Sequence, residues 1–157
     1  MTVFFLDSSA LVKRYVHELG LDVVRALAES SASRDDAIIV AHTSWVEVCS
    51  AFARLARERS LQPEDLAATL SALRFDWDSQ YQVIELDTTL VEAAADLLFR
   101  QPLRAFDAKQ LASCMRLRDA AAQLALDAVV FVSSDDRLLD AARNEGLRVQ
   151  NPNEMAR

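Results

Sequence analysis

"TVFFLDSSALVKRY", residues 2–15, is the stretch of sequence that decides the fold expected for this chain. Its apolar run at 3–6 lies between polar neighbours, a pattern typical of a short strand that is buried on both faces. One carboxylate, Asp7, follows directly, and two serines and a second apolar periodicity come after it. A charged side chain at the end of a buried strand requires a partner or a chemical role.

The same apolar signature recurs along the chain and predicts strands at 37–40, 82–86, 128–132 and, more weakly, 147–150. Apolar residues spaced i, i+3 and i+4 predict helices at 19–32, 43–59, 63–77, 88–100, 105–122 and 136–145. Pro63, Pro102 and Gly146 stand at the boundaries of these helices. Because strands that alternate with helices pair in parallel through right-handed crossovers, we expect an α/β fold. We expect this fold to be a three-layer α/β/α sandwich with a central, mainly parallel sheet of four to five strands.

Length and composition favour one ordered domain that spans residues 1–157. Hydrophobic residues make up 52% of the sequence, and only 2 Gly and 3 Pro interrupt them, which indicates a helix-rich globule. The N-terminal apolar run is far shorter than the ~18 residues of a membrane helix or the ~7 residues of a signal-peptide core. We therefore expect a cytoplasmic protein with no membrane partner.

The net charge of −7 is unusual for a nucleic-acid-binding protein, which normally presents a basic face. Two divalent cations bound to acidic side chains would reduce this charge to about −3, because metal ions are often the largest local charges in a site. Net charge therefore does not exclude a nucleic-acid substrate.

Acidic residues lie where the predicted strands end or where the following helices begin. In parallel sheets, ligands bind at these carboxyl ends, near the point where the strand order reverses. The acidic residues at such positions are Asp7, Glu47, Asp107, Asp135 and Asp136.

Each of these residues also has a purely structural explanation. Asp7, Asp107 and Asp135 are suitable N-caps, because a carboxylate accepts hydrogen bonds from the free N–H groups of a first helical turn. Glu47 lies about 140° from the centre of the apolar stripe of its helix, which favours exposure to solvent. Small neighbours, Ser44 and Ala51, would nevertheless let another element approach Glu47, so the pattern leaves its position open.

A shared cation would explain why several carboxylates lie at one edge of the sheet. Asp107 lies at the rim of a buried helix face, where a carboxylate needs a partner. Several carboxylates at one edge of a sheet would repel one another unless positive charge lay between them. Carboxylate oxygens are the ligands that Mg²⁺ and Mn²⁺ prefer, and metal-assisted chemistry on a phosphate is a common use of such a site.

Four segments of the chain together resemble the PIN-domain nucleases and, within them, the VapC-type toxins of toxin–antitoxin pairs. The segments are FLDSSALVKRY (5–15), SWVEVCSAFAR (44–54), LRAFDAKQLAS (103–113) and FVSSDDRLLDAARNEGL (131–147). They occur in the order and at the spacing of the family, so the resemblance covers essentially the whole chain.

The resemblance implies which residues form the site. Asp7, Glu47, Asp107 and Asp135 correspond to the acidic quartet that holds one or two Mg²⁺ or Mn²⁺ ions. The adjacent Asp136 leaves the choice of the fourth acid open. Ser8 or Ser9 is expected to support Asp7 by hydrogen bonding, and Ser133 occupies the hydroxyl position of the family.

The resemblance also implies an activity and partners. The activity is endoribonuclease cleavage, in which metal-activated water hydrolyses an RNA phosphodiester bond. The expected partners are an RNA substrate, a second copy of the chain in a homodimer, and a cognate antitoxin whose tail covers the active-site groove. Basic residues near the strand ends are candidates for RNA contact, namely Lys13, Arg14, Arg104, Lys109 and Arg137.

Other readings of the sequence are less consistent with its residues. An inactive PIN-like module that binds RNA or protein without cutting has the same fold, and metal binding would discriminate between the two. A receiver domain needs an acidic pair after its first strand, whereas Asp7 stands alone there. A phosphatase with an aspartate nucleophile needs a second acid at the position of Ser9. The sequence does not identify the RNA target.

Overall fold

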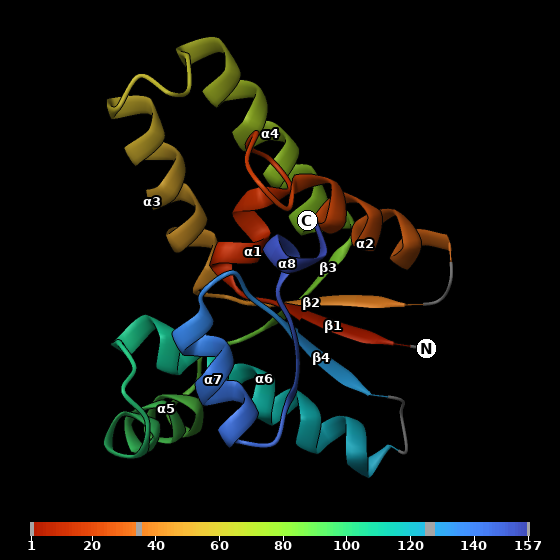
Figure 1. Ribbon diagram of the computed structural model, residues 1–157, viewed down its shortest axis with the longest axis vertical. Helices are drawn as coiled ribbons and strands as arrows, with labels where there is room; N and C mark the ends of the chain where they lie inside the picture. Colours follow the sequence, from red (N-terminus) through yellow and green to blue (C-terminus); the bar gives the residue numbers. More distant parts are fainter. Residues whose placement is uncertain (1, 34–35, 125–127, 157) are drawn as a thin grey trace.

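The computed structural model describes residues 2–33, 36–124 and 128–156 of the chain (Figure 1). Within these residues, five strands form one sheet in the order β3-β2-β1-β4-β5, and every neighbouring pair is parallel. The strands are β1 (Val3–Leu6), β2 (Ala37–Ala41), β3 (Tyr81–Ile84), β4 (Val129–Val132) and β5 (Arg148–Gln150). The predicted parallel sheet of an α/β fold is confirmed, and it has five strands, the larger of the two numbers expected. The strand predicted at 82–86 is wrong at its end, because Glu85 and Leu86 lie beyond β3.

Helices cover both faces of this sheet. They are α1 (Ser8–Lys13), α2 (Leu21–Ser33), α3 (Ser44–Arg57), α4 (Pro63–Ser79), α5 (Thr88–Arg100), α6 (Ala105–Gln123), α7 (Asp136–Asn144) and α8 (Pro152–Met155). The six predicted helices agree with the structure to within two residues at each end. The predicted helices do not include α8 or α1, although Asp7 is the N-cap of α1, one of the roles that the sequence suggested for it.

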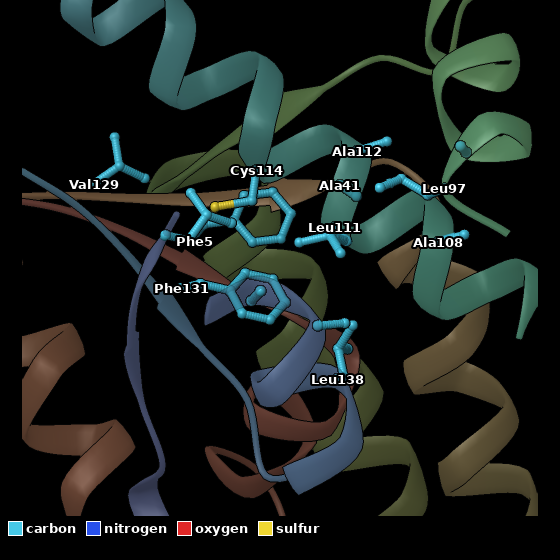
Figure 2. Close-up of a cluster of buried hydrophobic side chains, with 14 of the residues drawn as sticks. Phe5, Ala41, Leu97, Ala108, Leu111, Ala112, Cys114, Val129, Phe131 and Leu138 are labelled. Atoms are coloured by element: carbon cyan, nitrogen blue, oxygen red, sulfur yellow. The ribbon is translucent and has the colours of Figure 1, made fainter. Parts of the chain in front are cut away.

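One layer of the sandwich consists of α5, α6 and α7 (Figure 1). Its core contains Phe5 and Phe131, whose rings stack with centroids 5.7 Å apart. Leu97, Leu111 and Leu138 from the three helices pack around these rings (Figure 2). The central strands are therefore anchored by aromatic and aliphatic contacts on this face.

The opposite layer is formed by α1, α2, α3 and α4 (Figure 1). Leu6 and Val40 from the sheet pack with Phe52 and Leu73 from α3 and α4, and all four side chains are buried. Because successive strand residues face opposite sides, Phe5 enters one core and Leu6 the other. This arrangement explains why β1 is apolar throughout rather than alternating.

The strand order reverses between β1 and β4, which are direct neighbours. Leu6 pairs with Val132 at the ends of these strands, and the Asp7 N–H continues the ladder by donating to the Val132 carbonyl at 3.0 Å. The reversal of strand order leaves a crevice at this edge of an open α/β sheet, and such crevices bind ligands. Asp7 therefore lies at this edge of the sheet, directly after a buried strand.

Helix boundaries follow local chemistry. Asp87 caps α5 by accepting a hydrogen bond from the Leu90 N–H at 2.8 Å, and Pro63 occupies the first turn of α4. Gly146 follows α7 with φ +79°, a left-handed conformation that glycine adopts without steric cost. Among the described residues, no helix combines the length and the apolar character that crossing a membrane requires.

Candidate functional site

Asp7 is a buried carboxylate at the carboxyl end of β1, and its side chain is 3% exposed. It is also the N-cap of α1, because its Oδ1 accepts a hydrogen bond from the Ala10 N–H at 2.9 Å. The pKa of the Asp7 carboxyl is raised from 3.8 to about 6, mainly by burial and to a smaller extent by the nearby charge of Glu47. Hydrogen bonds from Ala10, Ser9 and Ser133 oppose this increase.

Two serines orient the Asp7 carboxylate. The Ser9 hydroxyl donates to Oδ1 at 2.8 Å, and the Ser133 hydroxyl donates to Oδ2 at 2.8 Å. Ser9 accepts in turn from the Ser134 N–H, and Ser133 accepts from the Asp135 N–H at 3.1 Å. The loop after β4 is thereby tied to the loop after β1, so Asp7 and Asp135 share a connected hydrogen-bond network.

Glu47 lies in the first turn of α3 and points toward the neighbouring helices rather than into solvent alone. The Ser8 hydroxyl donates to Glu47 Oε2 at 2.7 Å, and the Gln110 amide donates to Oε1 at 2.8 Å. Gln110 is 1% exposed and also donates to Ser44 at 2.9 Å. The small residue at position 44 therefore lets α6 approach α3, and Glu47 occupies the inward position that the pattern left open.

Gln110 was missed by sequence reasoning. The available signal was a polar side chain on the buried face of α6, next to Ala108 and Leu111, where an amide requires partners. Its hydrogen bonds orient Glu47 in the way that a second layer of polar residues commonly orients metal ligands.

Asp107 and Asp135 share one basic partner, Arg137. The Arg137 guanidinium donates to Asp107 Oδ2 at 3.3 Å and lies 3.9 Å from Asp135 Oδ2. Asp107 also accepts from the Arg104 N–H at the start of α6. Asp135 caps α7 by accepting from the N–H groups of Arg137 and Leu138. Asp135 can therefore be both a helix cap and a metal ligand, because the cap uses Oδ1 and leaves Oδ2 available.

Asp136 is directed elsewhere. Its Oδ1 accepts a hydrogen bond at 2.8 Å from the amide of Asn151, a buried residue that caps α8. This contact ties the start of α7 to the C-terminal helix, which gives Asp136 a structural role of its own.

The predicted RNA-contacting residues fall into two groups. Lys13 is buried, donates to the Leu19 carbonyl and pairs with Glu18, while Arg14 pairs with Asp76 at 3.1 Å. Both lie at the end of α1 opposite to Asp7. Arg104, Lys109 and Arg137 instead flank Asp107 at the starts of α6 and α7.

The acidic residues do not all converge in one tight cluster. In the part of the chain that the structure describes, no three His, Cys, Asp or Glu side chains lie close enough together to hold a metal ion. Asp7 and Glu47 form one electrostatically coupled pair, and Asp107 and Asp135 form a second pair around Arg137. Among the described residues, no basic side chain pairs with Asp7 or Glu47.

Comparison with known proteins places the chain in a family. The model of the PIN domain matches residues 4–144. Two curated relatives in Mycobacterium tuberculosis, Ribonuclease VapC45 (strain CDC 1551 / Oshkosh) and Ribonuclease VapC49 (strain H37Rv), are each 30% identical over 152 residues. Each alignment covers 95% of this chain and 95% of the relative.

Solved structures share the fold. PAE2754 from Pyrobaculum aerophilum superposes with a TM-score of 0.62 at 20% identity, over 99% of this chain and 96% of that one. VapBC2 from Rickettsia felis, bound to a DNA fragment from its promoter, gives a TM-score of 0.61 at 14% identity, over 95% and 98%. The chain belongs to the PIN-domain family, and its curated relatives are VapC ribonucleases.

Proposed function

We propose that the chain is a single PIN-like nuclease domain that acts as a metal-dependent endoribonuclease, the toxin of a VapBC-type toxin–antitoxin pair. The observation that carries the proposal is the buried Asp7 carboxylate, held by two serines at the edge where the strand order reverses and faced by Glu47. Ionised together, these two acids lack a cationic partner among the described residues. The names of the relatives support the same activity.

The chemistry of the side chains suits a divalent cation, and binding one would require the Asp7–Glu47 pair and the Asp107–Asp135 pair to move closer together than they lie among the described residues. Mg²⁺ and Mn²⁺ prefer carboxylate oxygens, and the proposed ligands are Asp7, Glu47, Asp107 and Asp135. Arg137 now occupies the position between Asp107 and Asp135, so a metal ion that binds these two acids would have to displace its guanidinium. Asp135 is the better fourth acid, since Asp136 is held by Asn151. One or two bound ions would supply an activated water molecule and neutralise the charge that develops on the phosphate.

The chain's own residues orient and position the reactants. Ser9 and Ser133 fix the rotamer of Asp7, while Ser8 and Gln110 fix that of Glu47. We assign phosphate contacts to Arg104, Lys109 and Arg137, whose positive charge offsets the net charge of the chain locally. The described fold provides rigidity, because each acid follows a buried strand or begins a helix.

Partners follow from the relatives as proposals. The Rickettsia felis structure is named VapBC2, which supports the proposal that this chain binds a cognate antitoxin. We also propose that the chain forms a homodimer, as its resemblance to VapC-type toxins implies. Co-expression with the protein encoded by the adjacent reading frame should yield a stable complex that does not cleave RNA. Size-exclusion chromatography at high concentration tests the dimer, and a strict monomer would contradict it.

Cleavage of a labelled RNA by the wild type and by Asp7→Asn tests the activity. We expect the wild type to cut RNA with Mg²⁺ or Mn²⁺, and we expect cleavage to disappear with EDTA or in Asp7→Asn. Attack by water leaves no cyclic phosphate at the product ends, whereas attack by the neighbouring 2′-hydroxyl leaves a 2′,3′-cyclic phosphate. Cleavage that survives Asp7→Asn or yields cyclic ends would remove the proposal.

A second candidate is an inactive PIN-like module that binds RNA or protein. The observation that favours it is the contact of Arg137 with Asp107 and Asp135, which already compensates two of the acids. The absence of RNA cleavage by a folded wild type that also fails to bind Mn²⁺ would favour this module over the nuclease.

A further inference from the structure

The segment between β4 and α7 carries Asp135, and two consecutive residues near the C-terminus are bonded to its two ends. At the first end, the Ser133 N–H donates to the Gln150 carbonyl at 3.2 Å. At the other end, Asp136 Oδ1 accepts a hydrogen bond from the Asn151 amide at 2.8 Å. Asp135 therefore lies between two attachments to the C-terminal part of the chain.

The Asn151 side chain is fixed in one orientation. The residue is 7% exposed, and its Oδ1 accepts from the Asn153 N–H at 2.9 Å as the N-cap of α8. Because a backbone N–H can only donate, this bond identifies the amide oxygen and leaves Nδ2 to face Asp136. Pro152 follows directly and favours the extended backbone that Asn151 adopts, with φ −104° and ψ 112°.

Helix α8 is itself held closely against the fold, although it has only four residues. It packs on α2 (Figure 1). Gly20, directly before α2, has φ +91°, and a Cβ added there would lie 3.2 Å from both the Pro152 carbonyl carbon and Asn153 Oδ1. Since the two backbones approach this closely, α8 has little room to shift. Asn151 thus connects a closely packed helix to the segment that carries Asp135.

The position of the Asp135 carboxylate depends on the first turn of α7. Its Oδ1 accepts from the N–H groups of Arg137 and Leu138 at 3.0 Å and 3.2 Å. The Asp136 backbone lies between Asp135 and these N–H groups, so a displacement of Asp136 would move the cap and, with it, Asp135 Oδ2. Asp136 is exposed, which means that burial does not hold its side chain in place. The bond from the buried Asn151 amide supplies that restraint.

We infer that Asn151 is a positioning residue for Asp135 and acts through Asp136. This inference rests on the proposed metal-dependent function, and it assigns different roles to the two adjacent acids. Asp135 keeps an oxygen free for a cation, while Asp136 is the point at which the C-terminal segment restrains the loop. Hydrogen bonds that orient metal ligands commonly change metal affinity by roughly 10- to 100-fold.

Exchanging the two bonded side chains tests this role. Asn151→Asp keeps the oxygen that caps α8 but replaces the amide donor by a second carboxylate oxygen, which repels Asp136. Combining it with Asp136→Asn restores a donor and an acceptor in the reverse direction, and the double variant has the net charge of the wild type. Asn144→Asp is the matched control, because it adds the same charge at an exposed residue of α7.

Isothermal calorimetry of the metal-free proteins measures their affinity for Mn²⁺. We expect Asn151→Asp to bind at least about tenfold more weakly than the wild type, and the double variant to bind within about threefold of the wild type. The direction separates positioning from simple attraction, because an added negative charge alone, as in Asn144→Asp, does not weaken the binding of a cation.

Amide hydrogen exchange in EDTA gives a second readout that needs no metal. The N–H groups of Arg137 and Leu138, which cap on Asp135, should exchange faster in Asn151→Asp relative to those of β1, which report opening of the sheet. Their exchange should return to the wild-type rate in the double variant, and it should not change in Asn144→Asp.

The outcomes separate this inference from the proposed function. Weaker Mn²⁺ binding and faster exchange in Asn151→Asp, both restored in the double variant, would support it. Equal behaviour of Asn151→Asp and Asn144→Asp would overturn it. Restored exchange without restored Mn²⁺ binding in the double variant would also overturn it, because Asp136 would then be a metal ligand itself.

Two further results remain decisive. If Asn151→Asp does not fold, a double variant that folds and binds Mn²⁺ would support the positioning role, and a double variant that stays unfolded would overturn it. A wild type that binds no Mn²⁺ would refute the metal-dependent function, whereas the exchange of the Arg137 and Leu138 amides would still decide whether Asn151 restrains the Asp135 segment.

Discussion

Replacing the buried Asp7 by asparagine should stabilise the metal-free protein while removing its activity. The pKa of Asp7 is raised from 3.8 to about 6, mainly by burial, so ionisation of Asp7 opposes folding. This difference corresponds to roughly 3 kcal/mol in the free energy of unfolding above pH 6. Asparagine keeps an oxygen that accepts from Ala10 and Ser9, and the Ser133 hydroxyl can rotate to accept from its amide. We expect a rise in Tm of roughly 6–12 °C at pH 8.

The stability gained by Asp7→Asn should increase with pH. Because the folded-state pKa is raised, protonation of Asp7 stabilises the native state below about pH 4, and this contribution is lost as pH rises through about 6. The stability difference between Asp7→Asn and wild type should therefore be small at pH 4 and largest above pH 6.

Urea unfolding in EDTA between pH 4 and 8 measures this difference. Asp140→Asn is the control, because Asp140 is exposed and should change stability by less than about 0.5 kcal/mol. An Asp7→Asn variant that is no more stable than wild type at pH 8, or a gain that does not vary with pH, would refute the reasoning about Asp7.

Three further changes probe the site and its support. Gln110→Ala removes a donor to Glu47 and should lower Mn²⁺ affinity and cleavage rate by roughly 10- to 100-fold; unchanged values would exclude a positioning role. Arg137→Gln should tighten Mn²⁺ binding several-fold in calorimetry, because the guanidinium competes for Asp107, whereas weaker binding would contradict that competition. Phe131→Ala removes a fully buried ring stacked on Phe5 and should cost about 3–5 kcal/mol in urea unfolding, with a smaller loss indicating that the core relaxes.

Most of the fold could be predicted from sequence because its strands are buried on both faces. The run at 3–6 remains apolar for that reason, and parallel pairing follows from the alternation of strands and helices. The bounds of helix α1 could not be predicted in the same way, because its six residues make fewer than two helical turns. Its start depends on the Asp7 cap, which the sequence shows only as one of several roles. The order of the strands in the sheet could not be predicted from hydrophobic periodicity either, because it is determined by tertiary packing.

The candidate site was predicted in part. Asp7 follows from its place after a buried strand, whereas Ser9 and Ser133 were implied by the family resemblance. The structure brings both serines onto the Asp7 carboxylate. The exposure of Glu47 was ambiguous, because its angular position relative to the apolar stripe of α3 does not show whether α6 packs against it. Gln110 and the shared contact of Arg137 depend on distances between elements that are far apart in sequence. Such contacts leave no periodic signal.

The central claim is that these acids hold a divalent cation for RNA hydrolysis. Titration of Mn²⁺ into the wild type and into Asp7→Asn by isothermal calorimetry, with RNA cleavage followed over the same metal concentrations, tests it most directly. We predict saturable binding to the wild type, at least about tenfold weaker binding to Asp7→Asn, and cleavage that rises as the wild-type site fills. Absence of Mn²⁺ binding to the folded wild type, or RNA cleavage that persists in EDTA, would contradict the claim.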